Sequence, residues 1–398
     1  MKKICMAMGV AGAVAAAATA WGTTAFQLSN RLGFGYDDNV YQRENDTVDT
    51  FRIIEDIDAN LSVVLERTYL SLRYRPVLTW YEAREDDETD VVHNLTFNLL
   101  QELTPLLKLD LSDSLRAGEY PELYDDNGYV VRQDNDNYYN SARASLMYQI
   151  RPTTRLDLSG RYMTLSYSDD DDDAHRYDDY DSWVAGLTLR QSLANQTVLL
   201  VDGRYQQLNY AHALPDFSRD AEMIYGGIGL EHTFSRELIG SIRAGAEMRS
   251  YEDDKYYDDQ TRPYVEASLT LMPVSTTRFT LRGSYSISES DISNYLSQNR
   301  TYASISAAHD FTKRLSGYVS ASWAHGEYDG EYSLGRTAPD VDEDSYTVSA
   351  RLSWRVHEQH WIELNYQFIK LDSDSAARES YDDNRVDLAW KWQILNLR

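Results

Sequence analysis

The sequence has a single cysteine, Cys5, and few basic residues. Because Cys5 lies in a leader-like segment, the rest of the chain can form no disulfide and no thiolate metal site. No later stretch reaches the ~20 consecutive apolar residues of a transmembrane helix. There are 38 Lys and Arg against 64 Asp and Glu, for a net charge of -26. This charge argues against nucleic acid as a partner, because binding phosphates requires a basic face.

The N-terminus has the pattern of a secretion signal. Lys2 and Lys3 are followed by an apolar, small-residue stretch from Ile4 to Ala20. Small residues suited to cleavage stand at 18–20 and 23–25. We therefore predict a signal peptide over residues 1–25 and one outer-membrane domain over residues 26–398. A short membrane anchor is the alternative, although alanine-rich helices of this length insert poorly.

One short motif recurs through the chain. A tyrosine followed by two aspartates occurs at 36–38, 124–126, 177–179, 257–259 and 381–383. Each copy lies in an acidic segment between two runs of alternating apolar and polar residues. The chain also has 31 Tyr and 8 Trp, the residues that favour membrane interfaces. Strands joined alternately by long acidic loops and short turns are typical of an outer-membrane β-barrel.

The alternation sets the expected number of strands. Long acidic loops are predicted around residues 37–50, 82–90, 118–136, 168–181, 210–220, 251–261, 289–299, 327–344 and 372–384. The turns between them are short. This layout predicts an all-β, antiparallel up-and-down barrel of about 18 strands, with about 16 as the alternative because residues 197–250 are glycine-rich. Long loops face outside and short turns face the periplasm. The predicted location is the cell outer membrane, with its lipid and lipopolysaccharide as surroundings.

The inward faces of the predicted strands are rich in cations. Their positions in the alternation of apolar and polar residues make the following cations candidates for the pore lining: Arg31, Arg73, Arg75, Arg116, Arg143, Arg190, Arg204, Arg243, Arg282, Arg351, Arg355 and Lys391. Such a wall selects anionic solutes or holds an acidic polymer. The alternative is that these side chains brace the wall by pairing across strands. The carboxylates available for that are Asp56, Asp58, Asp110, Asp157, Asp202, Glu363 and Asp387.

The acidic loops offer weak metal candidates. These are Asp169, Asp170, Asp171, Asp172, Asp173, Asp178 and Asp179. Carboxylate clusters can hold Ca²⁺, but the glycine and final glutamate of an EF-hand loop are missing. The commoner interpretation is a hydrated surface that other divalent ions link to lipopolysaccharide. No other cofactor is expected.

No group of residues predicts catalysis. His93 and His309 have lipid-facing phases, and His357 and His360 lie in a predicted periplasmic turn. The histidines near the outer rim stand among so many aspartates that proximity to a carboxylate has little meaning. We therefore predict a protein that is not an enzyme and name no catalytic residue.

The segment from Leu32 to Tyr41, LGFGYDDNVY, resembles the opening of the putative β-barrel porin type 2 family. That family has a similar Gly-Tyr-Asp-x-Asn-Val segment at the end of its first strand. The resemblance implies a barrel associated with exopolysaccharide or capsule export. It also implies a polysaccharide cargo and a periplasmic polysaccharide-export partner that lacks its own membrane-spanning helix. The C-terminal Arg398 differs from the Phe that ends many outer-membrane barrels.

Two other functions fit the same residues. A passive porin for small solutes, anionic ones among them, would use the cationic wall and would need a long loop folded into the lumen. A surface binding or adhesion barrel would instead use the acidic loops. An open, ohmic pore favours the porin, and silence without a periplasmic partner favours export.

Overall fold

The computed structural model describes residues 23–84, 88–119, 123–124, 130–131, 136–167, 179–212, 218–252, 259–290, 295–328, 340–375 and 378–397. Within these ranges the chain forms strands, and no helix there is long and apolar enough to cross a membrane. The predicted signal peptide lies largely outside the described residues. Its last residues, 23–25, are the first three of strand β1.

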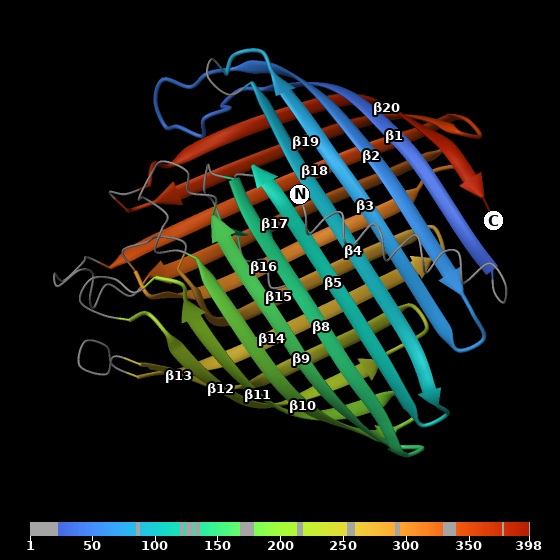
Figure 1. Cartoon of the computed structure of the whole chain (residues 1–398), viewed down its shortest axis with the longest axis vertical. Helices are drawn as coiled ribbons and strands as arrows, with labels where there is room; N and C mark the ends of the chain where they lie inside the picture. Colours follow the sequence, from blue (N-terminus) through green and yellow to red (C-terminus); the bar gives the residue numbers. More distant parts are fainter. Residues whose placement is uncertain are drawn as a thin grey trace.

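Eighteen antiparallel strands form one closed sheet, which confirms the larger of the two expected strand numbers (Figure 1). The first half of the wall consists of β1 (Thr23–Asp37), β2 (Thr50–Val64), β3 (Thr68–Tyr81), β4 (Thr89–Thr104), β5 (Leu107–Glu119), β8 (Asp136–Arg151), β9 (Thr154–Tyr167), β10 (Tyr180–Ala194) and β11 (Thr197–Tyr210). The second half consists of β12 (Ala221–Thr233), β13 (Leu238–Tyr251), β14 (Gln260–Val274), β15 (Thr277–Glu289), β16 (Ser297–Asp310), β17 (Leu315–Tyr328), β18 (Val341–His357), β19 (His360–Ser373) and β20 (Tyr381–Leu397). The glycine-rich stretch forms β11 to β13 with a continuous register.

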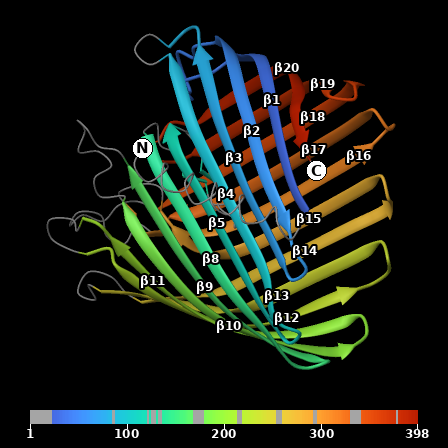
Figure 2. The ribbon, with the colours of Figure 1, turned by 45° about the vertical axis from the view of Figure 1, so that its right-hand side comes forward.

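Consecutive strands pair around the wall, and β1 pairs with β20 to close it. The strands are tilted, and β1 to β5 cross in front of β13 to β16 in Figure 2. Closure matters because a barrel leaves no sheet edge whose backbone groups would face lipid without hydrogen bonds.

Side chains alternate between lipid and lumen as expected. On β20, Val386, Leu388 and Trp390 are exposed on the outer surface. Asp387 and Lys391, between and beside them, line a lumenal cavity. The alternation of apolar and polar residues therefore determines which side chains face lipid and which face the lumen.

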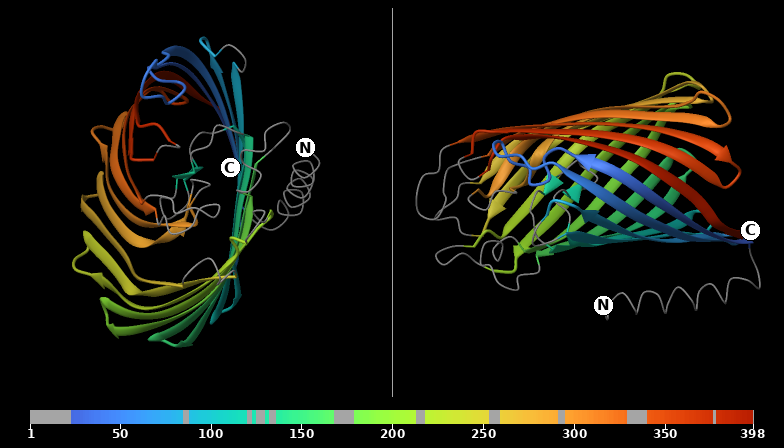
Figure 3. Two further views of the ribbon diagram at one scale, coloured as in Figure 1. Left: turned by 90° about the vertical axis from the view of Figure 1, so that its left-hand side faces the viewer. Right: turned by 90° about the horizontal axis from the view of Figure 1, so that it is seen from above.

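The two ends of the barrel differ. Eight turns of two to four residues connect the strands at one end, and the longer segments lie at the other. Both β1 and β20 have their terminal ends at the short-turn end (Figure 3). We call the two ends the short-turn end and the loop end.

One loop contains a hairpin of its own. Strands β6 (Leu123–Tyr124) and β7 (Val130–Val131) pair between β5 and β8. In both views of Figure 3 this short teal hairpin lies within the outline of the barrel. Gly118, just before it, has φ of +132°, and an added Cβ would stand 2.0 Å from the carbonyl oxygen of Val91. Only glycine suits this position.

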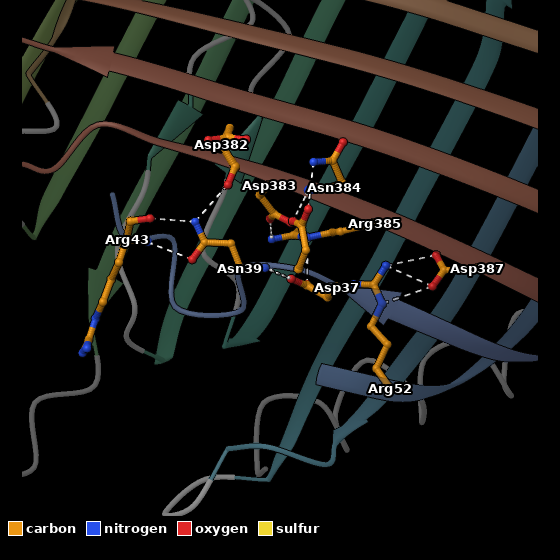
Figure 4. Close-up of polar contacts among 10 residues, drawn as sticks. Asp37, Asn39, Arg43, Arg52, Asp382, Asp383, Asn384, Arg385 and Asp387 are labelled. Atoms are coloured by element: carbon orange, nitrogen blue, oxygen red, sulfur yellow. Dashed lines mark hydrogen bonds and ion pairs between the residues drawn. The ribbon is translucent and has the colours of Figure 1, made fainter. Parts of the chain in front are cut away.

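At the loop end, barrel closure brings two of the five Tyr-Asp-Asp motifs together (Figure 4). The backbone N–H and side-chain amide of Asn384 donate to the Asp38 carboxylate, at 2.6 and 2.9 Å. Arg385 forms ion pairs with Asp37 at 3.1 Å and with Asp383 at 2.5 Å. The carboxylates of these two aspartates are almost fully buried.

Arg52 joins this closure cluster from β2. Its guanidinium donates twice to Asp387, both at 3.1 Å, and lies 3.6 Å from Asp37. Asn39 closes the adjoining loop by donating to the carbonyl oxygens of Arg43 and Asp382. Because arginines compensate the charge of the buried carboxylates, we interpret the cluster as a structural contact that joins the first and last strands.

The lumen as the candidate functional site

One side of the lumen is a charged wall built from β1, β2, β3 and β18 to β20. A cavity of about 570 Å³ lies against it. Arg73 donates to Asp58 at 2.8 and 2.7 Å, and Arg75 donates to Asp56 at 2.8 and 2.6 Å. Arg31 donates to Glu363 at 3.2 Å. Three of the predicted pore-lining cations are thus compensated by carboxylates on the same wall.

Two cations on this wall have no such compensation. Arg351 donates to the amide oxygen of Asn365 at 2.8 Å. Within the described residues no carboxylate lies within ion-pair distance of Arg351 or Lys391. Both side chains line the same cavity. Their charges remain available to a solute in the lumen.

The other side of the lumen holds a separate cavity of about 480 Å³, which we call the lobe. It is lined by residues of β8 to β15. Its charged lining side chains are Arg143, Arg161, Arg204, Arg243, Asp202, Glu247, Glu266 and Glu289. Its aromatic lining side chains are Tyr139, Tyr180, Tyr225 and Tyr264. Hydrogen-bond donors, acceptors and aromatic rings are therefore mixed on one surface.

Arg204 is held between two of these rings. Its guanidinium carbon lies 4.3 Å from the ring centre of Tyr225 and 5.0 Å from that of Tyr264. It also donates to the Tyr264 hydroxyl at 3.2 Å, and that hydroxyl donates to Glu266 at 3.0 Å. A guanidinium stacked on aromatic rings keeps its donors in a fixed plane.

The end of β15 forms a shelf at the lobe. The ladder between β14 and β15 ends at Val265 and Tyr285, whereas β13 continues to pair with β14 up to Gln260. Residues 286–289 of β15 instead line the lobe. Pro263 lies in the released part of β14, and a proline has no N–H to offer a neighbouring strand.

The shelf is held by side chains from strands beyond β14. The Ile287 N–H donates to the Glu247 carboxylate of β13. Glu289 accepts two hydrogen bonds from Arg249, at 3.1 and 2.6 Å, and one from the Tyr210 hydroxyl of β11 at 3.3 Å. Arg249 is fully buried. Residues 286–289 also keep their ladder with β16, so the loop ends of β15 and β16 separate from β14 together and are held against β13.

The remaining predicted cations are spread around the wall. Arg190 pairs with Glu231, and Arg355 donates to the carbonyl oxygen of Lys313 at 3.1 Å. Arg116 and Arg282 have lumenal register positions on β5 and β15, and Arg143 and Arg243 line the lobe. The described residues place no carboxylate within ion-pair distance of Arg243 or Arg282. Arg204 lies 3.4 Å from Asp202.

The carboxylates that were expected to pair with the lumenal cations have different partners. Asp157 pairs with Arg155 of its own strand, and Asp387 pairs with Arg52. No cation lies within ion-pair distance of Asp110 in the described part of the chain. Five of the predicted arginines, Arg31, Arg73, Arg75, Arg190 and Arg204, therefore pair with carboxylates in the described part of the chain, whereas Arg243, Arg282 and Arg351 do not.

The alternation alone did not identify several lumenal residues. Tyr225, Tyr264, Glu247 and Arg249 have lumenal phases, so their general direction could have been read from the sequence. Their grouping depends on the shelf, for which Pro263 inside a strand was the one available signal.

Most metal candidates, Asp169 to Asp173 and Asp178, lie outside the described residues. Asp179 accepts hydrogen bonds from the Tyr167 N–H at 2.8 Å and the Ser166 hydroxyl at 3.0 Å. No group of three or more His, Cys, Asp or Glu suited to a metal occurs in the described ranges.

Three of the described histidines make contacts on the outer surface or at the short-turn end. His93 Nδ1 lies 2.8 Å from the Tyr74 hydroxyl, and His309 Nδ1 lies 2.7 Å from the Thr277 hydroxyl. His360 accepts from the Trp390 indole at 3.2 Å.

A family model described as "Putative beta-barrel porin 2" matches residues 19–394. No curated protein matches. Among solved structures, the chain is similar to OccAB3 of Acinetobacter baumannii, with 12% identity, a TM-score of 0.47 and coverage of 93% of this chain and 99% of the other. It is also similar to OccK9 (OpdG) of Pseudomonas aeruginosa, with 12% identity, a TM-score of 0.48 and coverage of 93% and 98%. A third match is OpdK of Pseudomonas aeruginosa with vanillate, with 10% identity, a TM-score of 0.48 and coverage of 94% and 99%.

Proposed function

The chain belongs to the putative beta-barrel porin 2 family, and we propose that it forms the outer-membrane step of exopolysaccharide or capsule export. It is a porin-like β-barrel channel of the outer membrane.

The residues that line the lobe are the main support for this proposal. A sugar ring presents hydroxyl groups that both donate and accept, together with a face of C–H groups. The lobe presents guanidinium donors such as Arg204 and Arg243, carboxylate acceptors such as Glu266, and the ring of Tyr264. Pockets that recognise small polar molecules combine such convergent polar groups with aromatic surface. A repeating polymer would meet this surface once per repeat as it passes.

The uncompensated cations favour an acidic polymer. Arg351 and Lys391 lie on the charged wall, and Arg243 lies in the lobe. Rings of like charge set the selectivity of wide pores. Carboxylate, sulfate or phosphate groups on a polysaccharide would be attracted on both sides of the lumen.

Partners follow from the two ends of the barrel. The short-turn end is the periplasmic end under the usual orientation of such barrels. A periplasmic export protein without a membrane-spanning helix would deliver the polymer there. At the opposite end, acidic segments would bind Ca²⁺ or other divalent ions shared with lipopolysaccharide.

Passive diffusion of small anions is the second candidate. The observation that favours it is the β6–β7 hairpin, which lies within the barrel outline as a constriction loop would (Figure 3). Under this alternative the channel conducts freely, and polymer is not required.

Current recordings on the purified protein in planar bilayers separate the two candidates. Export predicts that an acidic polysaccharide added on the short-turn side blocks the current at concentrations where neutral dextran of equal length does not. Tyr225→Ala with Tyr264→Ala should weaken the block, whereas Tyr148→Ala, exposed on the outer surface, should not. An ohmic current that neither polymer blocks would contradict export and favour the passive porin.

A further inference from the structure

A further cavity of about 510 Å³ lies along the charged wall, toward the short-turn end of the barrel. It shares no lining residue with the lobe. We call it the short-turn pocket, and the lining side chains that give it its chemistry are Gln27, Asn60, Trp361, Lys391 and Gln393. Four of them, all except Lys391, stand within five residues of the short-turn end of their strands.

Strand register brings these side chains together. In the wall β1 lies between β2 and β20, and β19 follows β20 (Figure 1). Gln27 of β1 lies opposite Asn60 of β2, and Trp361 of β19 lies opposite Lys391 of β20. The pocket therefore spans the place where the first and last strands meet.

A β-bulge lies beside the pocket. Ser29 of β1 lies opposite Gln393 of β20, but the next pair is Leu28 with Leu395, so Ile394 has no partner on β1. Bulges redirect side chains, and they are common at the rims of barrels and next to functional sites. Gln393 is the last lumenal residue of β20 before this bulge, so the irregularity of the wall coincides with the pocket.

The protein itself does not use the neutral polar groups of the pocket. In the described ranges, no hydrogen bond joins the amides of Gln27, Asn60 and Gln393 to another protein group. The same is true there of the Trp361 indole N–H. These donors and acceptors face the lumen and remain available to a ligand.

Other glutamines near the short-turn end do have protein partners. Gln101 and Gln191 each accept a hydrogen bond from a threonine hydroxyl on the neighbouring strand, at 2.5 and 2.8 Å. Gln149 donates to a backbone carbonyl oxygen at 2.5 Å. An amide at this end of the barrel thus commonly holds a turn or a strand end in place. The pocket amides have no such structural role.

The available groups fit a saccharide unit with an acidic substituent. An amide both donates and accepts, so Gln27, Asn60 and Gln393 match the neighbouring hydroxyls of a sugar ring. The apolar face of an indole suits the C–H face of such a ring. Lys391, which has no carboxylate within ion-pair distance in the described residues, can pair with an acidic group of the sugar. An acyl chain needs an apolar lining, and Trp361 is the only large apolar side chain among the described residues that line this cavity.

We propose that the short-turn pocket binds one acidic saccharide unit of the polymer at the end where the polymer enters the barrel. Its volume of about 510 Å³ lies within the range of roughly 300–1,000 Å³ found for small-molecule sites. The proposal rests on the export function for the source of the saccharide. Binding itself is a property of the purified barrel and is measured without the cell.

Isothermal titration calorimetry of the detergent-purified barrel with tetragalacturonate tests the proposal. Trp361→Ala should weaken binding about tenfold, and Trp361→Phe, which keeps an aromatic face, should retain most of the affinity. Trp354→Ala is the matched control, because Trp354 is 53% exposed on the outer surface of the adjacent strand β18, and its loss should leave the affinity unchanged. Heat-modifiable migration on gels checks that each variant folds.

Lys391→Gln distinguishes recognition of the acidic group from recognition of the sugar ring. This change should weaken the binding of tetragalacturonate and leave that of neutral maltotetraose unchanged. No binding of tetragalacturonate to the wild type, or equal affinity in the wild type and Trp361→Ala, would overturn the proposal. A loss confined to Tyr225→Ala with Tyr264→Ala would place the ligand in the lobe and overturn it as well. Failure of the export function is seen separately, because unchanged polysaccharide secretion in a deletion strain would refute export without altering these affinities.

Discussion

Arg249 on β13 and Glu289 on β15 form a two-bond ion pair although β14 lies between their strands. This pair requires the loop end of β15, which stays paired with β16, to separate from β14 and approach β13 from the lumenal side. The ion pair and the shelf are therefore one feature, and the size of the lobe depends on it.

The first prediction concerns this shelf. Glu289→Ala removes the acceptor of Arg249 and Tyr210, so the loop end of β15, with the β16 residues paired to it, should be released from β13 and single-channel conductance should rise. Breaking a buried pair also costs about 3–5 kcal/mol of stability, so the unfolding temperature should fall. Glu327→Ala, at the loop end of β17 with 58% of its side chain exposed, is the matched control. A folded Glu289→Ala barrel with unchanged conductance would show that the shelf does not narrow the channel.

The second prediction distinguishes the cations that pair with a carboxylate from the cations that do not. Neutralising a compensated pair with Arg73→Gln and Asp58→Asn leaves the charge of the wall unchanged, so ion selectivity should stay the same. Arg351→Gln with Lys391→Gln removes two uncompensated charges and should shift the reversal potential in a salt gradient toward cation selectivity. Replacing Arg73, Arg75 and Arg351 together with Glu should reverse the selectivity. Equal shifts from the pair variant and the Arg351/Lys391 variant would refute this division of roles.

The third prediction concerns barrel closure. Arg52→Met leaves Asp37 and Asp387 buried with less compensation, so we expect a loss of about 3–5 kcal/mol of unfolding free energy. Lys370→Met is the control, since Lys370 and its partner Asp372 are each about half exposed. An exposed pair of this kind contributes about 0–1 kcal/mol. Urea unfolding in detergent, followed by tryptophan fluorescence, measures both. Similar losses of unfolding free energy from the two variants would argue against a stabilising contact between the first and last strands.

The sequence predicted most of the barrel because side-chain alternation is a local property. The lumenal direction of Arg73 or Lys391 follows from the neighbours on its own strand.

Contacts that depend on closure could not be predicted. The meeting of Asp37 with Arg385 requires the first and last strands to pair in one register. The division between compensated and uncompensated cations depends on distances across strands. The grouping of Tyr225, Tyr264 and Arg204 depends on neighbouring registers and on the shelf, and no local pattern encodes that shelf apart from Pro263.

The most direct test of export is a clean deletion of this gene, with extracellular, capsular and periplasmic polysaccharide measured separately. If the barrel exports polymer, the deletion strain loses polymer from the outside and accumulates it inside the cell envelope. The wild-type gene should restore secretion, and the Tyr225→Ala, Tyr264→Ala variant should restore less. Unchanged extracellular and capsular polysaccharide in the deletion strain would contradict a role in polymer export.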